Sequence, residues 1–583
     1  MPDRERPSTR TPAMPGSVLF MILRRLRAPM LLLVVVFAVG IAGLVLIPGV
    51  DAQGQTWHLT LFQALYFMSY TASTIGFGEI PQGFSDNQRL WVTVIIYASV
   101  IGWAILVASL LAMVQDRAFA AALATARFTR AVRSIGEPFL LICGFGETGL
   151  LLARALDRLG MRFVVIELEP ERAQAIELLQ LTQEVPTLAD DARVPEHLLM
   201  AGLAKRECQG VLALTNDDKA NLAVAMTVRL LNPRIPVLAR AMTRQVAANM
   251  ASFGTDGIIN PFTTFGGYLA LAVESPGSYR LLSWLTGAPG TSLKPETAPP
   301  RGRWVVCGYG RFGREVVEAF QRQEMNITVV DPNGCDAPDL RTVIGLGTDA
   351  EPLLEAGIEH AVGVIAGTDD DVNNLSIAVT ARELNPRLFT IVRQNLQSNH
   401  ALFEAYKADI TMVSSEIVAN ECLAVLKTPR LATFLQAVRG HDDAWADRVV
   451  ERLIATVGVE TPEIWGVAIS ASGAPAIHRA VMLDRRSVSL GALDRDPEDR
   501  ERVLPCVPLA IVRDGSLLEM PEQKQMLCAG DEVLYAGTPA ARRSQWLTLH
   551  NLNVRDYVLD GKDLPGGWIW QWWARRREGG RSD

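Results

Sequence analysis

The sequence predicts a membrane-embedded α-helical domain with two spanning helices, followed by two cytosolic α/β domains built on parallel sheets and a small α+β lobe. Three observations support this fold class. Two long apolar runs without a charged residue lie near the start of the chain. A glycine-rich motif between a strand-like and a helix-like segment occurs twice, and the C-terminal quarter alternates short apolar runs with Gly, Pro and Asp.

The composition excludes several classes of protein. The chain has 583 residues, of which 49% are hydrophobic and 20% charged, so it is too long for one domain and too apolar for an ordinary soluble enzyme. Its net charge of −7 provides no positive field, and we expect no nucleic-acid partner. The seven cysteines form no C-x-x-C pair and the seven histidines are widely scattered, so we expect neither a disulfide framework nor a zinc site.

The two apolar runs, residues 30–47 and 90–114, are each long enough to cross a bilayer as a helix, since about 20 residues span roughly 30 Å. Arginines precede the first run and follow the second. The positive-inside rule then predicts a multi-pass protein of the cell (inner) membrane with both termini in the cytoplasm. A cleaved signal peptide is the alternative for the first run, and the second span argues against it.

The loop between the two runs is too hydrophobic for a solvent-exposed connection. Its apolar residues recur at helical spacing, which predicts a pore helix at 57–70 that re-enters the membrane. The segment that follows alternates glycines with other residues, and glycine reaches positive φ without steric cost. Successive carbonyls can then face one axis and replace the water shell of a monovalent cation.

This segment resembles the signature filter of potassium channels. The predicted filter consists of Thr74, Ile75, Gly76, Phe77 and Gly78. The resemblance implies K⁺ as the permeant ion and a homotetramer in the lipid bilayer, because each chain supplies one quarter of the pore. Phe77 replaces the usual tyrosine and Glu79 the usual aspartate. A hydroxyl that braces the filter is thereby lost, which leaves a weakly selective cation channel as an alternative.

The resemblance also makes residues 90–114 the inner, pore-lining helix. Gly102 lies in the middle of this helix, where the missing Cβ weakens it by about 1 kcal/mol. Gly102 is therefore a candidate gating hinge. Close packing against a neighbouring helix is an equally good explanation of this glycine.

Two copies of a strand, glycine turn, helix, strand and acid follow the spans. In each copy the acid lies 23 residues after the first glycine. The glycines permit a tight turn, close approach of a diphosphate and packing of helix on strand, and the acid accepts the ribose diol. These residues are Gly144, Gly146, Gly149 and Glu167 in the first copy and Gly308, Gly310, Gly313 and Asp331 in the second. The pattern is typical of a Rossmann-like fold.

The repeat continues beyond the glycines. Asp191 matches Asp349, and Arg240 matches Arg393. We expect Asp191, Asp349, Arg393 and the glycine-turn residue Arg311 to contribute to nucleotide binding. The pattern resembles the RCK domain (the TrkA-N or KTN module), and with the pore it resembles bacterial two-transmembrane potassium channels with tandem RCK domains. In that family eight such domains form a cytosolic gating ring.

The two copies differ in the charge of the glycine turn. Glu147 in the first copy repels a diphosphate, whereas Arg311 in the second can pair with one. We therefore expect the second copy to prefer diphosphates, and the first to hold a less charged ligand or a nucleotide with Glu147 turned outward. Glu167 and Asp331 disfavour a 2′-phosphate, so NAD or ADP is the expected regulatory ligand. An empty scaffold is the alternative for either copy.

Acidic pairs follow a strand in each copy, at residues 217–218 and 369–371. Carboxylates suit Ca²⁺, so a calcium site is an open possibility, although such acids more often cap the next helix. No metal ligand is assigned.

The expected domains are a cytosolic tail at 1–29, a pore domain at 30–115, a gating linker at 116–137, a first RCK domain at 138–295, a second at 302–430, a C-terminal lobe at 431–560 and a tail at 561–583. A Trp- and Arg-rich cluster ends the chain and either packs on the lobe or lies at the membrane surface. The combined prediction is a potassium-selective channel gated by a cytosolic ligand, and not an enzyme. A membrane-anchored NAD-dependent oxidoreductase and a regulatory subunit of a separate transporter are the alternatives.

Overall fold

The computed structural model describes residues 16–50, 55–73, 75–79, 82–287, 292–293, 298–427 and 429–562. The chain divides into two compact units. The first contains the residues up to Gly136 together with segments 186–188 and 196–202. The second contains the remainder, which is most of the first α/β domain, all of the second and the C-terminal lobe. The predicted tail cluster at 568–577 and Thr74 lie outside the described residues.

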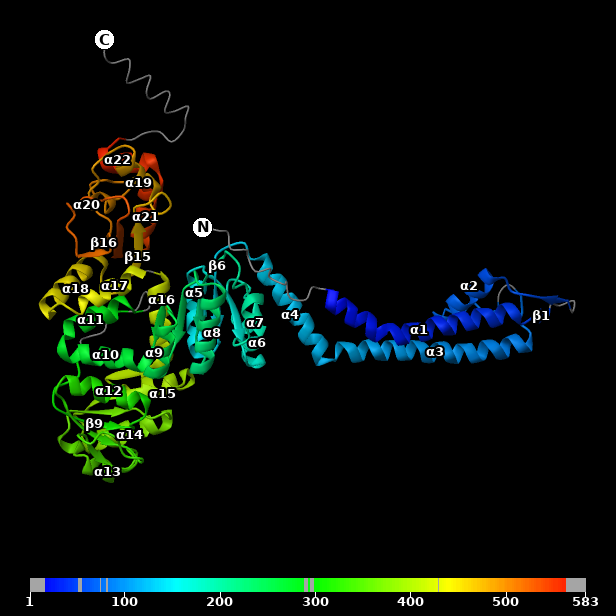
Figure 1. Ribbon diagram of the computed structural model, residues 1–583, viewed down its shortest axis with the longest axis horizontal. Coiled ribbons are helices and arrows are strands. Elements are labelled where there is room, and N and C mark those ends of the chain that lie inside the picture. The colour runs from blue at the N-terminus through cyan, green and yellow to red at the C-terminus, as the bar shows by residue number, and fades with distance from the viewer. Residues whose placement is uncertain are drawn as a thin grey trace, which may run out of the picture. The chain divides into compact units, whose positions relative to one another are not determined.

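The first unit is helical (Figure 1). Its elements are α1 (Gly16–Leu46), β1 (Gly49–Val50), β2 (Thr56–Trp57), α2 (Leu61–Ala72), α3 (Asp86–Val114) and α4 (Arg117–Ser134). Leu26–Leu46 and Asp86–Val114 are long and apolar enough to cross a membrane. The helix α1 begins at Gly16 rather than at residue 30, because the segment before the apolar run, which includes Arg24 and Arg27, continues the same helix. The pore helix begins at Leu61 rather than at residue 57, because Thr60 caps it with its side chain.

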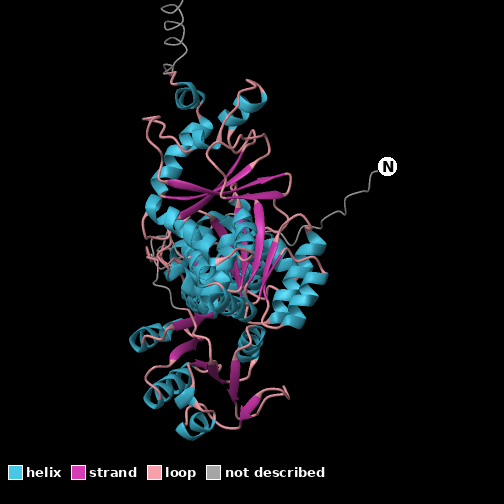
Figure 2. Ribbon diagram, turned by 90° about the vertical axis from the view of Figure 1, so that its left-hand side faces the viewer, coloured by secondary structure: helices cyan, strands magenta, loops and turns pink. Residues whose placement is uncertain are grey.

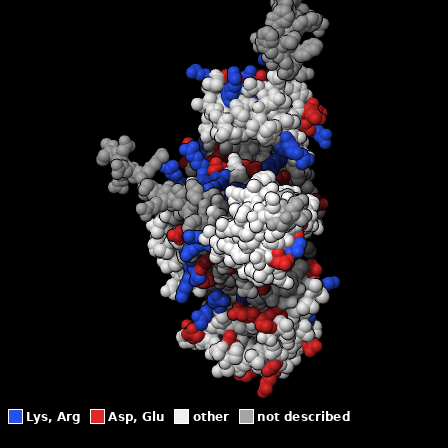
Figure 3. Space-filling view, turned by 90° about the vertical axis from the view of Figure 1, so that its right-hand side faces the viewer, with Lys and Arg blue, Asp and Glu red and all other residues white. Residues whose placement is uncertain are grey.

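Small residues let the helices of this unit pack closely. A Cβ on Gly43 would overlap the indole of Trp91, and a Cβ on Gly40 would lie 2.9 Å from Cε of Met68. The Trp91 Nε1 donates a hydrogen bond of 3.3 Å to the Gly40 carbonyl. The faces of α1 and α3 that do not pack on each other expose large apolar side chains. Figure 3 views the molecule from the side on which α2 lies in Figure 1, where uncharged residues predominate in the foreground. Lipid contact accounts for such a surface.

The first α/β domain has a six-stranded sheet in the order β5-β4-β3-β6-β7-β8. Its strands are β3 (Phe139–Cys143), β4 (Arg162–Glu167), β5 (Thr187–Ala189), β6 (Cys208–Ala213), β7 (Val237–Arg240) and β8 (Gly257–Ile259). Its helices are α5 (Glu147–Arg158), α6 (Pro170–Leu178), α7 (Pro195–Met200), α8 (Asp218–Leu231) and α9 (Arg244–Ser252). The central strands pair in parallel, and β3 is buried throughout.

The second α/β domain repeats this topology, with a parallel sheet in the order β11-β10-β9-β12-β13-β14. Its strands are β9 (Arg303–Cys307), β10 (Asn326–Val330), β11 (Arg341–Val343), β12 (Gly363–Ala366), β13 (Phe389–Gln394) and β14 (Ile410–Val413). Its helices are α12 (Arg311–Arg322), α13 (Ala350–Glu355), η1 (Ile358–His360), α14 (Asp371–Leu384), η2 (Gln397–Asn399) and α15 (His400–Tyr406). The prediction of two doubly wound sheets is confirmed. In both sheets the strand order reverses beside the glycine turn, where ligands bind in such folds.

The two α/β domains exchange helices. The helix α10 (Pro261–Glu274) follows the first sheet, yet Phe262 and Phe265 are buried against Phe312 of α12, with ring centroids 5.9 and 5.7 Å away. The helix α16 (Ser414–Lys427) follows the second sheet, yet Val418 and Cys422 lie in the core of the first domain. Each domain therefore completes the hydrophobic core of the other.

The C-terminal lobe contains a four-stranded antiparallel sheet in the order β15-β18-β16-β17 (Figure 2). Its strands are β15 (Glu463–Ala468), β16 (Cys506–Arg513), β17 (Ser516–Glu519) and β18 (Glu532–Gly537). Its helices are α17 (Pro429–Val438), α18 (Asp443–Val457), α19 (Pro475–Met482), α20 (Leu490–Leu493), α21 (Pro539–His550) and α22 (Leu552–Asp560). The predicted α+β lobe is thereby confirmed.

The helix α11 (Pro276–Leu285) joins this lobe, although its sequence position lies within 138–295. Its Leu281 and Leu282 are buried with residues of α17 and α18. The Asp443 carboxylate of α18 accepts hydrogen bonds from the Gly277 amide, at 2.9 Å, and from the Ser275 hydroxyl, at 2.6 Å. These contacts attach the lobe to the segment that leaves the first domain.

Candidate functional site

The predicted filter follows the pore helix α2 directly. Gly76 and Gly78 have φ of +67° and +92°, in the left-handed region that only glycine adopts readily. The amides of Ile75 and Gly76 donate hydrogen bonds of 2.9 and 3.3 Å to the Tyr70 carbonyl at the end of α2. The positive φ values expected of these glycines are therefore present.

A tyrosine of the pore helix braces the filter. The Tyr70 hydroxyl donates a hydrogen bond of 2.6 Å to the Gly78 carbonyl, and its ring meets the Phe77 ring edge-on at 5.4 Å between centroids. Phe77 stands where the potassium-channel filter usually has a tyrosine, so the hydroxyl of that tyrosine is absent from the filter segment. Tyr70 of α2 thus places a hydroxyl against the filter segment, from a different element than Phe77.

Glu79 ties the end of the filter to the inner helix. One carboxylate oxygen accepts from Arg89 Nε at 2.9 Å, and the other accepts from Arg89 Nη2 at 3.1 Å and from the Phe84 amide at 2.8 Å. A bidentate pair of this kind fixes geometry as well as charge. Tyr70 and Arg89 are the pore residues that the sequence analysis did not identify, because neither belongs to the filter segment itself.

Gly102 is buried in the middle of α3. A Cβ at this position would lie 3.7 Å from Leu33 Cγ, an ordinary van der Waals distance. Packing of α1 on α3 therefore does not require glycine here. The hinge role of Gly102 stays a prediction.

In the first α/β domain the predicted glycines and acid meet at the end of β3. Gly144 has φ of +94°, and a Cβ on Gly149 would lie 2.8 Å from the Gly144 carbonyl oxygen. The Glu167 carboxylate accepts hydrogen bonds from the Phe145 amide of the glycine turn and, at 3.0 Å, from the Glu169 amide. Asp191 follows β5 and pairs with Arg193 at 2.7 Å. Glu167 thus holds the glycine turn in place through its hydrogen bond with the Phe145 amide.

The second α/β domain has the same arrangement beside an open cavity. Gly308 has φ of +96°, and the Asp331 carboxylate accepts from the Tyr309 amide at 2.7 Å and from the Asn333 amide at 2.8 Å. The cavity measures about 340 Å³ and its lining includes Gly308, Gly310, Asp331, Thr348, Thr368 and Arg393. Asp349 directly precedes α13, next to Thr348. Most predicted residues of the second site therefore surround one cavity of ligand size.

Arg393 gives this cavity a buried cation. It is 7% exposed, pairs with Asp369 at 2.7 Å and lies over the Phe262 ring at 4.8 Å from the centroid. Burial lowers the pKa of the Arg393 guanidinium, and Asp369 opposes this change. Among the described residues its Nε has no hydrogen-bond partner. A buried donor without an acceptor fits a ligand that carries phosphate oxygens.

Charged residues of both α/β domains act on Arg240. Burial lowers the pKa of Arg240 and the negative charge of Asp218 raises it, while the positive charges of Arg311 and Arg393 lower it and the negative charge of Glu147 raises it. The Glu147 carboxylate accepts a hydrogen bond of 2.8 Å from the Gln397 amide of the second domain. The Glu147 carboxylate is thus engaged by the second domain, and its being turned outward from a bound nucleotide stays a prediction.

The acidic pairs after β6 and β12 are used within the protein. Asp217 and Asp370 cap α8 and α14 by accepting amide hydrogen bonds. The Asp371 carboxylate accepts from the amides of Asn395 and Leu396 at 2.6 and 3.0 Å. No group of three or more His, Cys, Asp or Glu in the described part of the chain is placed to hold a metal ion. The capping role of these acids is therefore the one present.

Family models match both parts of the chain. The model described as "Ion channel" matches residues 30–116, and the "TrkA-N domain" model matches residues 140–261 and 304–415. Two relatives come from Methanocaldococcus jannaschii. "Potassium channel protein 1" is 23% identical over 26% of this chain and 46% of the relative, and "Probable potassium channel protein 2" is 23% identical over 38% and 63%.

A protein of Methanothermus fervidus described as "Uncharacterized protein" is 26% identical over 42% of this chain and 37% of its own length. The chain thus matches between about one third and two thirds of these relatives. The solved structures "GsuK Channel" and "GsuK channel bound to NAD" are 17% and 16% identical, with TM-scores of 0.48 and 0.46. Each alignment covers 91% of this chain and 99% of the other. From the family models, the chain carries an ion-channel domain at residues 30–116 and two TrkA-N domains at residues 140–261 and 304–415.

Proposed function

We propose that the chain is a potassium-selective channel whose open probability is set by a cytosolic nucleotide, NAD or ADP, bound to its TrkA-N domains. The observation that carries the proposal is the filter. Two glycines with positive φ follow a capped pore helix between two apolar helices, within the matched ion-channel domain. A backbone of this kind presents carbonyl oxygens to a dehydrated cation.

A complete pore requires four chains, because one filter segment supplies one quarter of the carbonyl ring. We therefore propose a homotetramer in the cell (inner) membrane with both termini in the cytoplasm. The pore occupies residues 30–115 and the linker 116–137 connects it to RCK domains at 138–295 and 302–430, with the C-terminal lobe at 431–560. Gly102 is the proposed hinge of the inner helix.

The proposed ligand site is the cavity of the second TrkA-N domain. In this proposal Asp331 receives the ribose hydroxyls and Arg393, which lines the cavity, pairs with the phosphates. Arg311 begins α12 directly after Gly310, outside the cavity lining, and is proposed to reach the phosphates from there. A ligand that prefers one conformation of the domains by about 1 to 3 kcal/mol per site, in four chains, shifts a closed pore to an open one or the reverse. In this role NAD binds without being reduced.

The test is single-channel recording of the purified full chain in a planar bilayer, with K⁺ on one side, Na⁺ on the other, and NAD or ADP added to the cytosolic face. The expected result is a reversal potential near that of K⁺ and an open probability that changes with nucleotide. A reversal potential near zero would contradict selectivity. Turnover of NADH with carbonyl substrates, in a protein without current, would favour the oxidoreductase instead.

A further inference from the structure

The two TrkA-N domains carry opposite charges at two corresponding positions. The first helical residue after the glycine turn is Glu147 in the first domain and Arg311 in the second. Five residues after the ribose-binding acid, the first domain has Arg172 and the second has Asp336. Each domain therefore keeps one acid and one arginine near its nucleotide site, with their positions exchanged.

Arg172 reaches the glycine turn of the first domain. It lies on α6, and its Nη1 is 3.7 Å from the point that a Cβ on Gly146 would occupy. The middle glycine of this motif lacks a side chain so that a diphosphate can approach the backbone there. No atom lies within 4 Å of the same point at Gly310 of the second domain. Arg172 therefore occupies the face of the turn that a diphosphate would contact.

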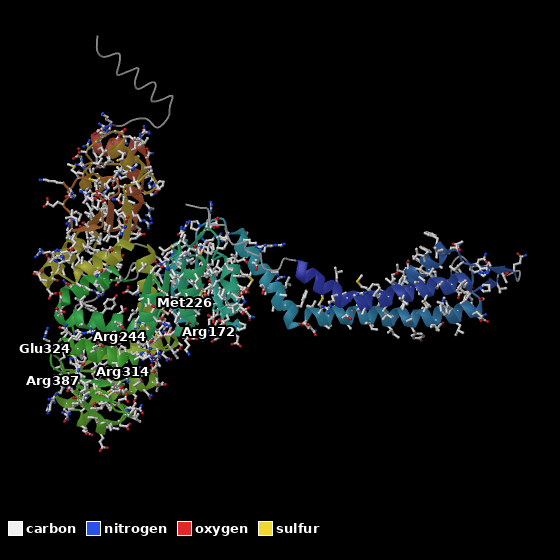
Figure 4. The ribbon with its side chains drawn as sticks, in the orientation of Figure 1. Arg172, Met226, Arg244, Arg314, Glu324 and Arg387 are labelled. Atoms are coloured by element: carbon white, nitrogen blue, oxygen red, sulfur yellow. The ribbon has the colours of Figure 1, made fainter. Side chains whose placement is uncertain are left out.

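The ion pair of Arg172 with Glu169 leaves Arg172 available to a ligand, because both side chains are exposed. Its Nε lies 2.7 Å from the Glu169 carboxylate, and the two side chains are 47% and 58% exposed. Exposed pairs of this kind contribute little to stability, whereas a guanidinium and a phosphate form strong charge-assisted hydrogen bonds. Figure 4 labels Arg172 on the first TrkA-N domain.

The negative charge of Glu147 repels a diphosphate at the first glycine turn less than its sequence position indicates. Its carboxylate is turned to the second domain, where it accepts the Gln397 amide at 2.8 Å. In the second domain the exchanged acid is also engaged, since Asp336 pairs with Arg314 at 3.0 Å. Figure 4 labels Arg314 on that domain. In both domains the acid is held by a protein group and an arginine stays beside the turn.

We infer that Arg172 binds the phosphate of a nucleotide in the first TrkA-N domain, where it takes the role that Arg311 has in the second. This inference rests on the proposed function, because it requires that the glycine turn of the first domain binds a nucleotide. It changes the ligand expected there. The first site takes a diphosphate-bearing nucleotide such as ADP, rather than a less charged ligand.

The experiment measures binding to the full chain in lipid nanodiscs, with Asp331→Ala present throughout to weaken the second site. Calorimetric titrations with ADP and with adenosine compare three further changes: Arg172→Gln, Glu167→Ala and, as a matched control, Arg234→Gln at an exposed turn of the same domain. We expect Arg172→Gln to weaken ADP binding about tenfold or more and to leave adenosine binding unchanged, since only ADP carries the phosphates. Unchanged adenosine binding also shows that the domain is folded.

Two outcomes would overturn the inference, and they are distinguishable. If Glu167→Ala abolishes ADP binding while Arg172→Gln and Arg234→Gln bind ADP equally, the nucleotide site stands and the role of Arg172 is wrong. If ADP binding is absent before any change in the first domain, the first site binds no nucleotide, and the inference fails together with that part of the proposed function.

Discussion

The hydroxyl of Tyr70 lies 2.6 Å from the carbonyl oxygen of Gly78 and donates a hydrogen bond to it. This contact joins the pore helix to the last glycine of the filter across eight residues of chain. It places a bracing group on α2 instead of within the filter segment.

Tyr70→Phe removes this hydrogen bond and keeps the ring that packs on Phe77. A neutral hydrogen bond contributes about 1 kcal/mol, so we expect the K⁺ to Na⁺ permeability ratio to fall by a factor on the order of five. Reversal potentials under a K⁺ to Na⁺ gradient measure the ratio. Tyr66→Phe is the matched control, because Tyr66 is on the same helix and half exposed. An equal ratio in both variants would show that the Tyr70 hydroxyl does not brace the filter.

Gly76→Ala tests the backbone requirement of the filter. No atom lies within 4 Å of the added Cβ, so the effect arises from the φ of +67° and not from a clash. A left-handed residue with a side chain costs about 1 to 2 kcal/mol, and the filter relaxes to another conformation. We expect loss of K⁺ current with nucleotide binding retained, measured by recording and by titration. Gly83→Ala, where φ is ordinary, should conduct normally, and current in Gly76→Ala would contradict the filter assignment.

Asp331→Ala separates the gating domains from the pore. It removes the acceptor of the Tyr309 amide and of the proposed ribose hydroxyls. We expect the nucleotide concentration that gives a half-maximal response to rise about tenfold or more, which is the effect of losing a charge-assisted hydrogen bond. The unitary conductance should not change. Recordings over a range of NAD and ADP concentrations measure both quantities. Asp339→Ala, at an exposed position nearby, serves as control, and a changed selectivity in Asp331→Ala would refute this separation.

Asp494 makes the stability of the C-terminal lobe depend on pH. The side chain is 1% exposed, and burial raises its pKa from the ordinary 3.8 to about 7. Because the folded pKa lies above the unfolded one, the unfolded state loses its proton first. Stability is therefore highest below pH about 4 and falls as pH rises to about 7, by a few kcal/mol (about 1.4 kcal/mol for each pKa unit), and is constant above.

Asp494→Asn should remove this dependence and melt at a higher temperature than the wild type at pH 8. Thermal melts at pH 5 and pH 8 measure the effect. Asp499→Asn, an exposed neighbour, should keep the wild-type dependence. Identical pH profiles for Asp494→Asn and the wild type would show that Asp494 does not titrate in this range.

Local chemistry explains which features the sequence predicts. The two spans follow from charge-free apolar runs, and the positive φ of Gly76, Gly78, Gly144 and Gly308 follows from motifs that only glycine satisfies. The two doubly wound parallel sheets follow from the repeated strand, helix and strand pattern. Such features depend on residues that are close together in the chain.

Contacts between distant segments explain what the sequence does not predict. Glu147 and the Gln397 amide are separated by 250 residues, and nothing in the glycine motif indicates which group the carboxylate meets. The orientation of Glu147 and the approach of Arg172 to Gly146 depend on how whole domains pack. The contact of the Tyr70 hydroxyl with the Gly78 carbonyl is likewise not predicted by the filter motif, because Tyr70 belongs to the preceding helix.

The exchange of α10 and α16 makes the tandem repeat a dimer fused in one polypeptide. A domain without its counterpart would expose the apolar residues of the helix it donates and leave its own core uncovered. A deletion of the second TrkA-N domain should therefore destabilise the first as well, and a lone domain of this kind would need a second copy of itself to cover its core. Linkage in one chain replaces that encounter with an intramolecular one at high effective concentration. Because the two TrkA-N domains are joined, each can diverge in sequence and still pack on the other. The opposite charges of Glu147 and Arg311 at corresponding positions illustrate such divergence.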